Sequence, residues 1–181
     1  MTDDSSALAT LFIDDTTATF RRQKELAERA IGQVADDEFF RMVDAESNSI
    51  AIIAKHVGGN LRSRFTDFLS TDGEKPDRDR DGEFIAESRA SRAEIMSAWD
   101  TGWSVLFASL AALRPEHLLS TVHIRAEPMP VVAALHRALA HVAQHVGQIV
   151  WLAKHLRSAD WKTLSIPRGQ STEWRVGQPP R

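Results

Sequence analysis

The chain has 181 residues, no cysteine, and a net charge of −3 from 22 basic and 25 acidic side chains. The absence of cysteine excludes disulfides, thiolate metal sites and cysteine nucleophiles. The near balance of charge argues against a general nucleic-acid binder, which needs a basic face.

Apolar residues at helical spacing predict a first helix from about Leu8 to Val34. Threonines at 16, 17 and 19 weaken its middle, because β-branched residues have low helix propensity, so we expect a kink or a late start. Asp36 and Asp37 follow as turn or capping residues, with one short helical turn near 38–42.

A second helix should begin after Asn48 or Ser49, both good N-cap residues, and it contains Gly58-Gly59. Each interior glycine costs about 1 kcal/mol relative to alanine, so the pair needs a reason. Close approach of a neighbouring backbone is one reason, and a bend is another. The segment 70–84, rich in Gly, Pro and alternating charge, predicts a long loop. It is either a plain connector or a rim over a site.

The third helix is expected over about 88–113, with Ser88 or Ser91 as its cap and an apolar stripe that includes Trp99 and Trp103. The β-branched stretch 121–124, closed by later prolines, predicts an extended segment or a small hairpin.

The last and longest helix should begin at Pro130 or Val131 and end near Leu156. The tail that follows is irregular, with Trp161 and Trp174 as candidates for packing onto the helices. The elements together predict an all-α fold in one domain, 1–181, with a long loop between the second and third main helices.

A pair of histidines on the last helix carries the first sign of chemistry. His141 and His145 are four residues apart, so their side chains differ by about 40° around the helix axis and about 6 Å along it. Two imidazoles in this arrangement can bind one metal ion, as in HExxH proteases, but Val142 stands where that motif has its Glu. The protease mechanism is therefore not implied.

His56 lies in the other strongly apolar helix and is the candidate third ligand. By itself it would more often be a hydrogen-bonded core residue. Together with His141 and His145 it would form a three-imidazole site with open positions for water or substrate. Neutral nitrogen ligands suit Zn or Ni, with Fe, Co and Cu as alternatives, better than Mg or Ca.

Other polar residues could support this site. Asn60 follows His56 by one helical turn, and Gln148 follows His145 by about one turn, so either could orient a ligand or a bound water. A plain helix-surface role is the alternative for both. Three arginines, on the second helix and beyond, could receive an anionic cofactor or substrate: Arg62, Arg64 and Arg125.

Three segments resemble the DinB/YfiT-like superfamily, and in particular a branch known only as a domain of unknown function. They are SNSIAIIAKHVGGNLRSRFTDFLSTDGEKP, LAHVAQHVGQIVWLAKHL and WKTLSIPRGQS. The resemblance implies a four-helix bundle, often dimeric, with a divalent metal held by one histidine of the second helix and an i, i+4 pair of the last main helix. His56, His141 and His145 match those positions.

The resemblance also implies a set of activities. Some relatives are S-transferases that use low-molecular-weight thiols, one is a thiol-dependent isomerase, and others are described as hydrolases. We therefore expect a metal-dependent transferase acting on a small molecule, with a hydrolase or a non-enzymatic, stress-related protein with a structural metal as alternatives. The acidic N-terminus and the short apolar runs favour a cytoplasmic protein with no membrane partner, and the near balance of charge favours one with no nucleic-acid partner. A homodimer is implied by the resemblance alone.

Overall fold

The computed structural model describes residues 2–85 and 90–172. This part of the chain is mostly helical, which confirms the predicted fold class at that level. Its α-helices, in chain order, are α1 (Thr2–Ile31), α2 (Asp36–Phe39), α3 (Ile50–Phe65), α4 (Arg92–Ala111) and α5 (Val131–Arg157). One antiparallel hairpin, β1 (Thr121–Ile124) and β2 (Glu127–Pro130), confirms the hairpin alternative for that segment.

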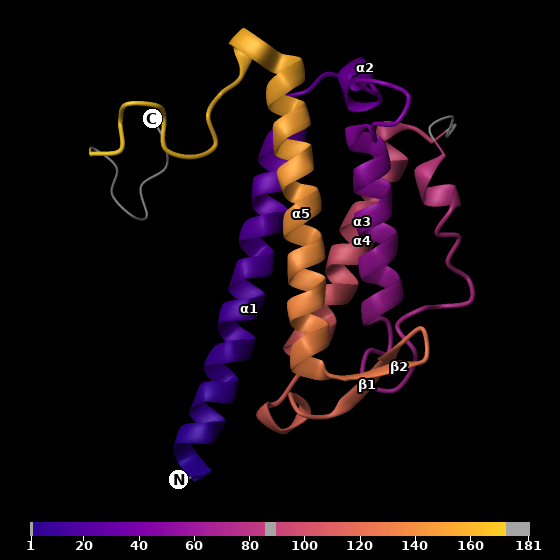
Figure 1. The fold of residues 1–181 in the computed structure, drawn as a ribbon, viewed down its shortest axis with the longest axis vertical. Helices are drawn as coiled ribbons and strands as arrows, with labels where there is room; N and C mark the ends of the chain where they lie inside the picture. Colours follow the sequence, from indigo (N-terminus) through magenta and orange to yellow (C-terminus); the bar gives the residue numbers. More distant parts are fainter. Residues whose placement is uncertain (1, 86–89, 173–181) are drawn as a thin grey trace.

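The four long helices run side by side, and the hairpin lies across one end of them (Figure 1). Helix α3 packs along α4, α1 packs along α5, and α3 also contacts α5. A single apolar core lies between them, and its largest fully buried side chains are Trp99, Trp103 and Phe20. The N-terminal part of α1 extends past the hairpin end of the other helices (Figure 1).

Helix α1 differs from the sequence expectation, because it starts at Thr2 and is unbroken to Ile31. The threonines do not interrupt it, because tertiary packing of the helix offsets their low helix propensity. The Thr17 hydroxyl donates to the Ile13 carbonyl at 2.8 Å, one turn back. Thr16 is buried, so packing against the neighbouring helices offsets its low propensity.

Serine caps set the first residues of α3 and α4. The Ser49 hydroxyl accepts from the Ile52 amide at 3.2 Å, as predicted. Ser91, the second of the two expected caps, forms a reciprocal capping box with Glu94. The other expected cap, Ser88, lies outside the described residues.

Two glycines allow α3 and α4 to approach closely. A Cβ atom on Gly58 would lie 2.9 Å from the Ala98 carbonyl oxygen and 3.0 Å from the Trp99 Cα, while one on Gly102 would collide with the Gly58 backbone. Close backbone approach is therefore the reason for Gly58, the first alternative the sequence offered. This contact sets the position of α3, and so of His56, along the axis of α4.

The segment after α5 turns back and contacts the chain just after α1. The backbone amide of Lys162 donates to Gln33 Oε1 at 2.8 Å, and Gln33 Nε2 donates to the Lys162 carbonyl at 3.0 Å. Trp161 is half-buried against the core, as expected, whereas Trp174 lies outside the described residues. Over the described ranges, none of the helices is both long enough and apolar enough to cross a membrane.

Candidate metal centre

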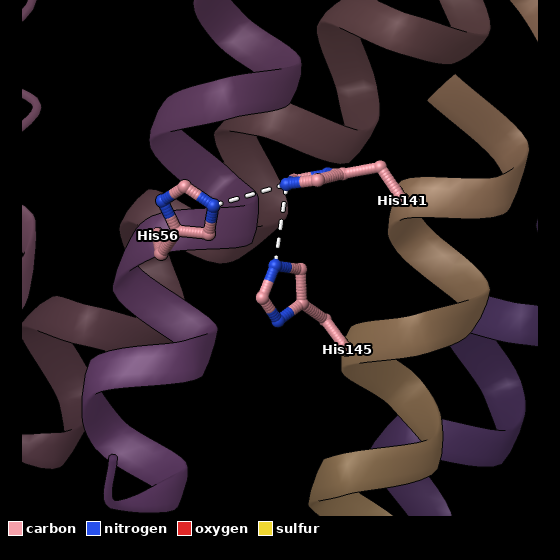
Figure 2. Close-up of side chains that lie close together, drawn as sticks. All are labelled: His56, His141 and His145. Carbon is pink, nitrogen blue, oxygen red and sulfur yellow. Dashed lines mark hydrogen bonds between the residues drawn. The ribbon is translucent and has the colours of Figure 1, made fainter. Parts of the chain in front are cut away.

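Three imidazoles from two helices meet between α3 and α5 (Figure 2). His56 lies on α3, and His141 and His145 lie one turn apart on α5. The Nε2 atom of His141 is 3.1 Å from that of His56 and 3.2 Å from that of His145. With one ring nitrogen from each histidine within 4.8 Å of the others, the group could hold a metal ion.

The far nitrogens of two of these rings are held by hydrogen bonds. His56 Nδ1 donates to the Glu83 carboxylate at 2.8 Å, because an ionised carboxylate can only accept. His145 Nδ1 lies 2.8 Å from the Gln148 side-chain oxygen, which likewise requires a proton on the ring nitrogen. In the neutral rings of His56 and His145 the Nε2 atoms are therefore bare lone pairs.

This tautomer assignment tests whether the residues fit a metal. Two bare Nε2 lone pairs, from His56 and His145, both face the Nε2 atom of His141. A neutral His141 can carry at most one proton there, so it cannot make a full hydrogen bond to both. Its own Nδ1 is buried without a hydrogen-bond partner in the described part of the chain. A cation would satisfy all three lone pairs at once, so the donor set fits a metal ion.

Burial favours the neutral form of the His141 and His145 rings. It lowers the pKa of His141 to about 3, and the neighbouring His145 and His56 add to the shift. Burial also lowers the pKa of His145, which the hydrogen bond with Gln148 partly offsets. Neutral imidazole is the form that binds a metal, so His141 and His145 are already in the binding form at pH 7.

Glu83 is a site residue that the sequence analysis missed. It lies in the short 3₁₀ helix Gly82–Phe84 near the end of the long loop, and its side chain is only 8 % exposed. A Cβ atom on Gly59 would collide with its carboxylate, so Gly59 is what lets Glu83 reach α3. The only sequence signal was the loop itself, for which a rim over a site was one of two interpretations.

Arg78 holds Glu83 in place. Its Nε donates to Glu83 Oε1 at 2.9 Å and its Nη2 to Oε2 at 2.8 Å. Burial by itself would raise the pKa of Glu83, but the hydrogen bonds from His56 and Arg78 outweigh it and bring the pKa below its usual value. Because both carboxylate oxygens are engaged, Glu83 orients His56 and is not a free general base.

A cavity of about 190 Å³ opens beside the histidines. His56, His141 and the predicted supporting residue Asn60 line it, as do two of the three arginines singled out from the sequence, Arg64 and Arg125. The third, Arg62, is instead half exposed and pairs with Asp77 at 2.9 Å. Gln148, the other predicted supporting residue, contacts His145 directly.

The remaining histidines stay apart from the centre. His136 packs edge-on against Phe12, and His155 stacks on Trp151, which is 57 % exposed. Their contacts are those of packing and surface residues.

The comparisons with known proteins match this chain at the level of a family. Residues 7–170 match the model of a family described as a protein of unknown function, DUF1572. The matched range includes the three histidines, Glu83 and every residue that lines the cavity. The comparison with curated proteins and the comparison with solved structures each gave no match. The prediction of a domain of unknown function is thereby confirmed, and the chain belongs to the DUF1572 family.

Proposed function

We propose that His56, His141 and His145 bind one divalent transition metal and that the protein is a metal-dependent transferase for a low-molecular-weight thiol and a small-molecule substrate. The observation that carries this proposal is the set of Nε2 lone pairs that converge without enough protons to bond to one another. Three neutral nitrogen ligands favour Zn or Ni, with Fe, Co and Cu next.

The surrounding residues favour thiol transfer over hydrolysis. A metal on three protein ligands keeps open positions and lowers the pKa of a thiol or water bound there. Among the described residues that line the cavity none is acidic, and the Glu83 carboxylate is fully engaged. A thiol bound in this way ionises without a general base, whereas HExxH-type hydrolysis uses one. Hydrolysis is therefore the second candidate.

A structural metal in a non-enzymatic protein is the third candidate. Structural zinc sites are closed by four protein ligands. In the described ranges the metal-binding group consists of three residues, and two of them face a cavity. An accessible metal beside an open cavity is the arrangement of a catalytic site, so we rank the enzyme first.

The proposal includes the finer fold assignment. The placement of one histidine on α3 and an i, i+4 pair on α5 is the pattern of the DinB/YfiT-like four-helix bundle. We further propose that the chain is a single domain of this type and that it acts as a homodimer, as the same resemblance implies.

The first test measures metal content in protein without an affinity tag. After loading with Zn²⁺ or Ni²⁺ at pH 7.5 and gel filtration, we expect one ion per chain, and none in His145→Ala. His155→Ala is the matched control, because it removes a histidine from the same helix outside the centre. If the wild type retains no metal, the proposed site is wrong.

The second test measures activity of the loaded protein with a panel of small thiols and an electrophile that reports thioether formation. We expect turnover with at least one thiol, and none in His145→Ala. Turnover of ester substrates without thiol would favour the hydrolase instead. A protein that binds one metal but is inert in both panels would overturn the enzymatic assignment while leaving the metal site intact.

A further inference from the structure

The cavity beside the histidines is strongly basic. Five arginines line it, and no acidic residue among the described residues does so. They come from α3, the long loop, the hairpin turn and α5, so four separate segments bring a positive charge to one place. These arginines are Arg64, Arg78, Arg80, Arg125 and Arg137.

In the described part of the chain, fewer carboxylates than arginines are paired around the cavity. Glu74 is shared, since Arg64 Nη2 and Arg125 Nε both donate to its Oε2 atom at 2.9 Å. The Glu83 carboxylate is the second partner, and it accepts hydrogen bonds from Arg78 and His56. The exposed carboxylate of Asp81 lies 3.7 Å from Arg80 Nη1, and Arg137 has no ion pair among the described residues. Burial, together with the positive charges of its neighbours, lowers the pKa of Arg64. Three carboxylates thus pair with four of the five arginines, which leaves a surplus of positive charge around the cavity.

Arg78 has an unmet donor at the cavity wall. Its side chain is only 4 % exposed, and its Nη1 atom is buried without a hydrogen bond to any described residue. The Oε1 atom of Glu74 is 3.7 Å from it, which is too far for a hydrogen bond. An unsatisfied buried donor costs about 1–3 kcal/mol, and more for a charged group. Such a donor beside a basic cavity indicates a missing acceptor.

The two helices place these charges on one side of the histidines. On α3, His56, Asn60 and Arg64 follow one another at intervals of four, and all three line the cavity. On α5, Arg137 precedes His141 by four and lies on the same face. Residues four apart are about 6 Å apart along a helix, and the two helices run in opposite directions (Figure 1). The basic groups of both helices therefore lie toward the hairpin end of the cavity.

We propose that this cavity binds an oxyanion, the carboxylate or phosphate group of a small molecule whose other end faces His56 and His141. Guanidinium groups bind both kinds of oxyanion with paired hydrogen bonds. A volume of about 190 Å³ is slightly larger than an engineered cavity of about 150 Å³ that takes benzene, so the cavity suits a compact acid or the acidic end of a larger molecule. The proposal rests on the proposed function only in making this anion part of the substrate, because anion binding itself needs no metal.

The test titrates succinate and inorganic phosphate, in separate arms, into chelator-treated and Zn²⁺-loaded protein at constant ionic strength by calorimetry. Succinamide is the neutral control for succinate. We expect one site for at least one anion in both preparations, and no binding of succinamide. Binding of phosphate only, or of succinate only, would identify the source of the oxyanion.

Two variants locate the site. Arg137→Gln removes a charge from the cavity, and we expect at least tenfold weaker anion binding. Arg22→Gln is the matched control, because Arg22 is exposed on α1 and its substitution removes the same charge at a site away from the cavity. Equal weakening in both variants, or no binding of either anion to the wild type, would overturn the oxyanion site. If the chelator-treated protein binds the anion but no preparation retains metal after loading, only the metal site is overturned.

Discussion

The hydrogen bond between Glu83 and His56 offers a sharp test of how the centre is built. Glu83→Gln keeps an oxygen that can accept from His56 Nδ1 but removes the negative charge. It also turns an amide NH₂ group toward Arg78, whose Nε and Nη2 both donate to the carboxylate in the wild type. The substitution therefore weakens the support of His56 and leaves Arg78 without its closest counter-ion.

The magnitude follows from the burial of the pair. The side chains of His56 and Glu83 are 5 % and 8 % exposed, so water cannot replace the lost interaction. Loss of a hydrogen-bond partner behind a metal ligand typically lowers metal affinity about 10–100-fold, which corresponds to about 1.4–2.8 kcal/mol. The substitution also breaks the buried ion pair between Arg78 and Glu83, and breaking such a pair costs about 3–5 kcal/mol of folding stability. We therefore expect Glu83→Gln to lower both the metal affinity and the stability.

The two losses are measured separately. Competition with a chromogenic Zn²⁺ chelator gives the metal affinity of the folded protein, and urea denaturation of chelator-treated protein gives the stability. Gln148→Ala is the matched control, because its contact with His145 is exposed and water can replace it. We expect it to lower affinity less than Glu83→Gln does. Wild-type Zn²⁺ affinity in folded Glu83→Gln would refute the role assigned to Glu83.

Two further predictions concern stability. Gly102→Ala should destabilise the protein by about 1–3 kcal/mol in urea denaturation, because the new methyl group meets the Gly58 backbone. Gly147→Ala should instead stabilise it by up to about 1 kcal/mol, since no atom lies within 4 Å of the added Cβ. Equal effects of the two substitutions would contradict the close α3–α4 contact. In chelator-treated protein, the melting temperature should fall as the pH drops from about 6.5 toward 3, because the unfolded chain takes up a proton that folded His141, with a pKa of about 3, does not. Below about pH 4.5 the depressed pKa of Glu83 adds a further loss of stability. If the melting temperature of the wild type stays flat between pH 6.5 and 5, as in His141→Gln, the contribution assigned to His141 is wrong.

Much of the fold could be predicted from local signals. Ser49 marked the start of α3, and apolar spacing marked the long helices, because capping and amphipathic periodicity are local properties of the chain. The start of α1 was missed because residues 2–7 carry few apolar residues, so the helix there has no periodic signal. The threonines were misjudged because burial, which offsets the low propensity of Thr16, is visible only in the folded chain.

The candidate centre divides in the same way. The i, i+4 spacing of His141 and His145 by itself determined that both rings share one helix face, because helix geometry follows from sequence separation. That His56 meets them was a hypothesis, since it depends on how far α3 slides along its neighbours. The contact between Gly58 of α3 and Gly102 of α4 sets that position. Nothing in the sequence around Gly102 indicates that Gly58 is the residue it packs against.

Only the tertiary structure brought Glu83 and Arg78 to the histidines. Both lie in the mixed-charge loop, where no periodicity links a residue to a direction in space. Their places are decided by long-range contacts: Gly59 leaves room for the Glu83 carboxylate, and His56 and Arg78 hold it there. The sequence by itself thus determined the helices and the histidine pair, while the position of the third histidine, its carboxylate support and the basic cavity arose from packing between segments that are distant in the chain.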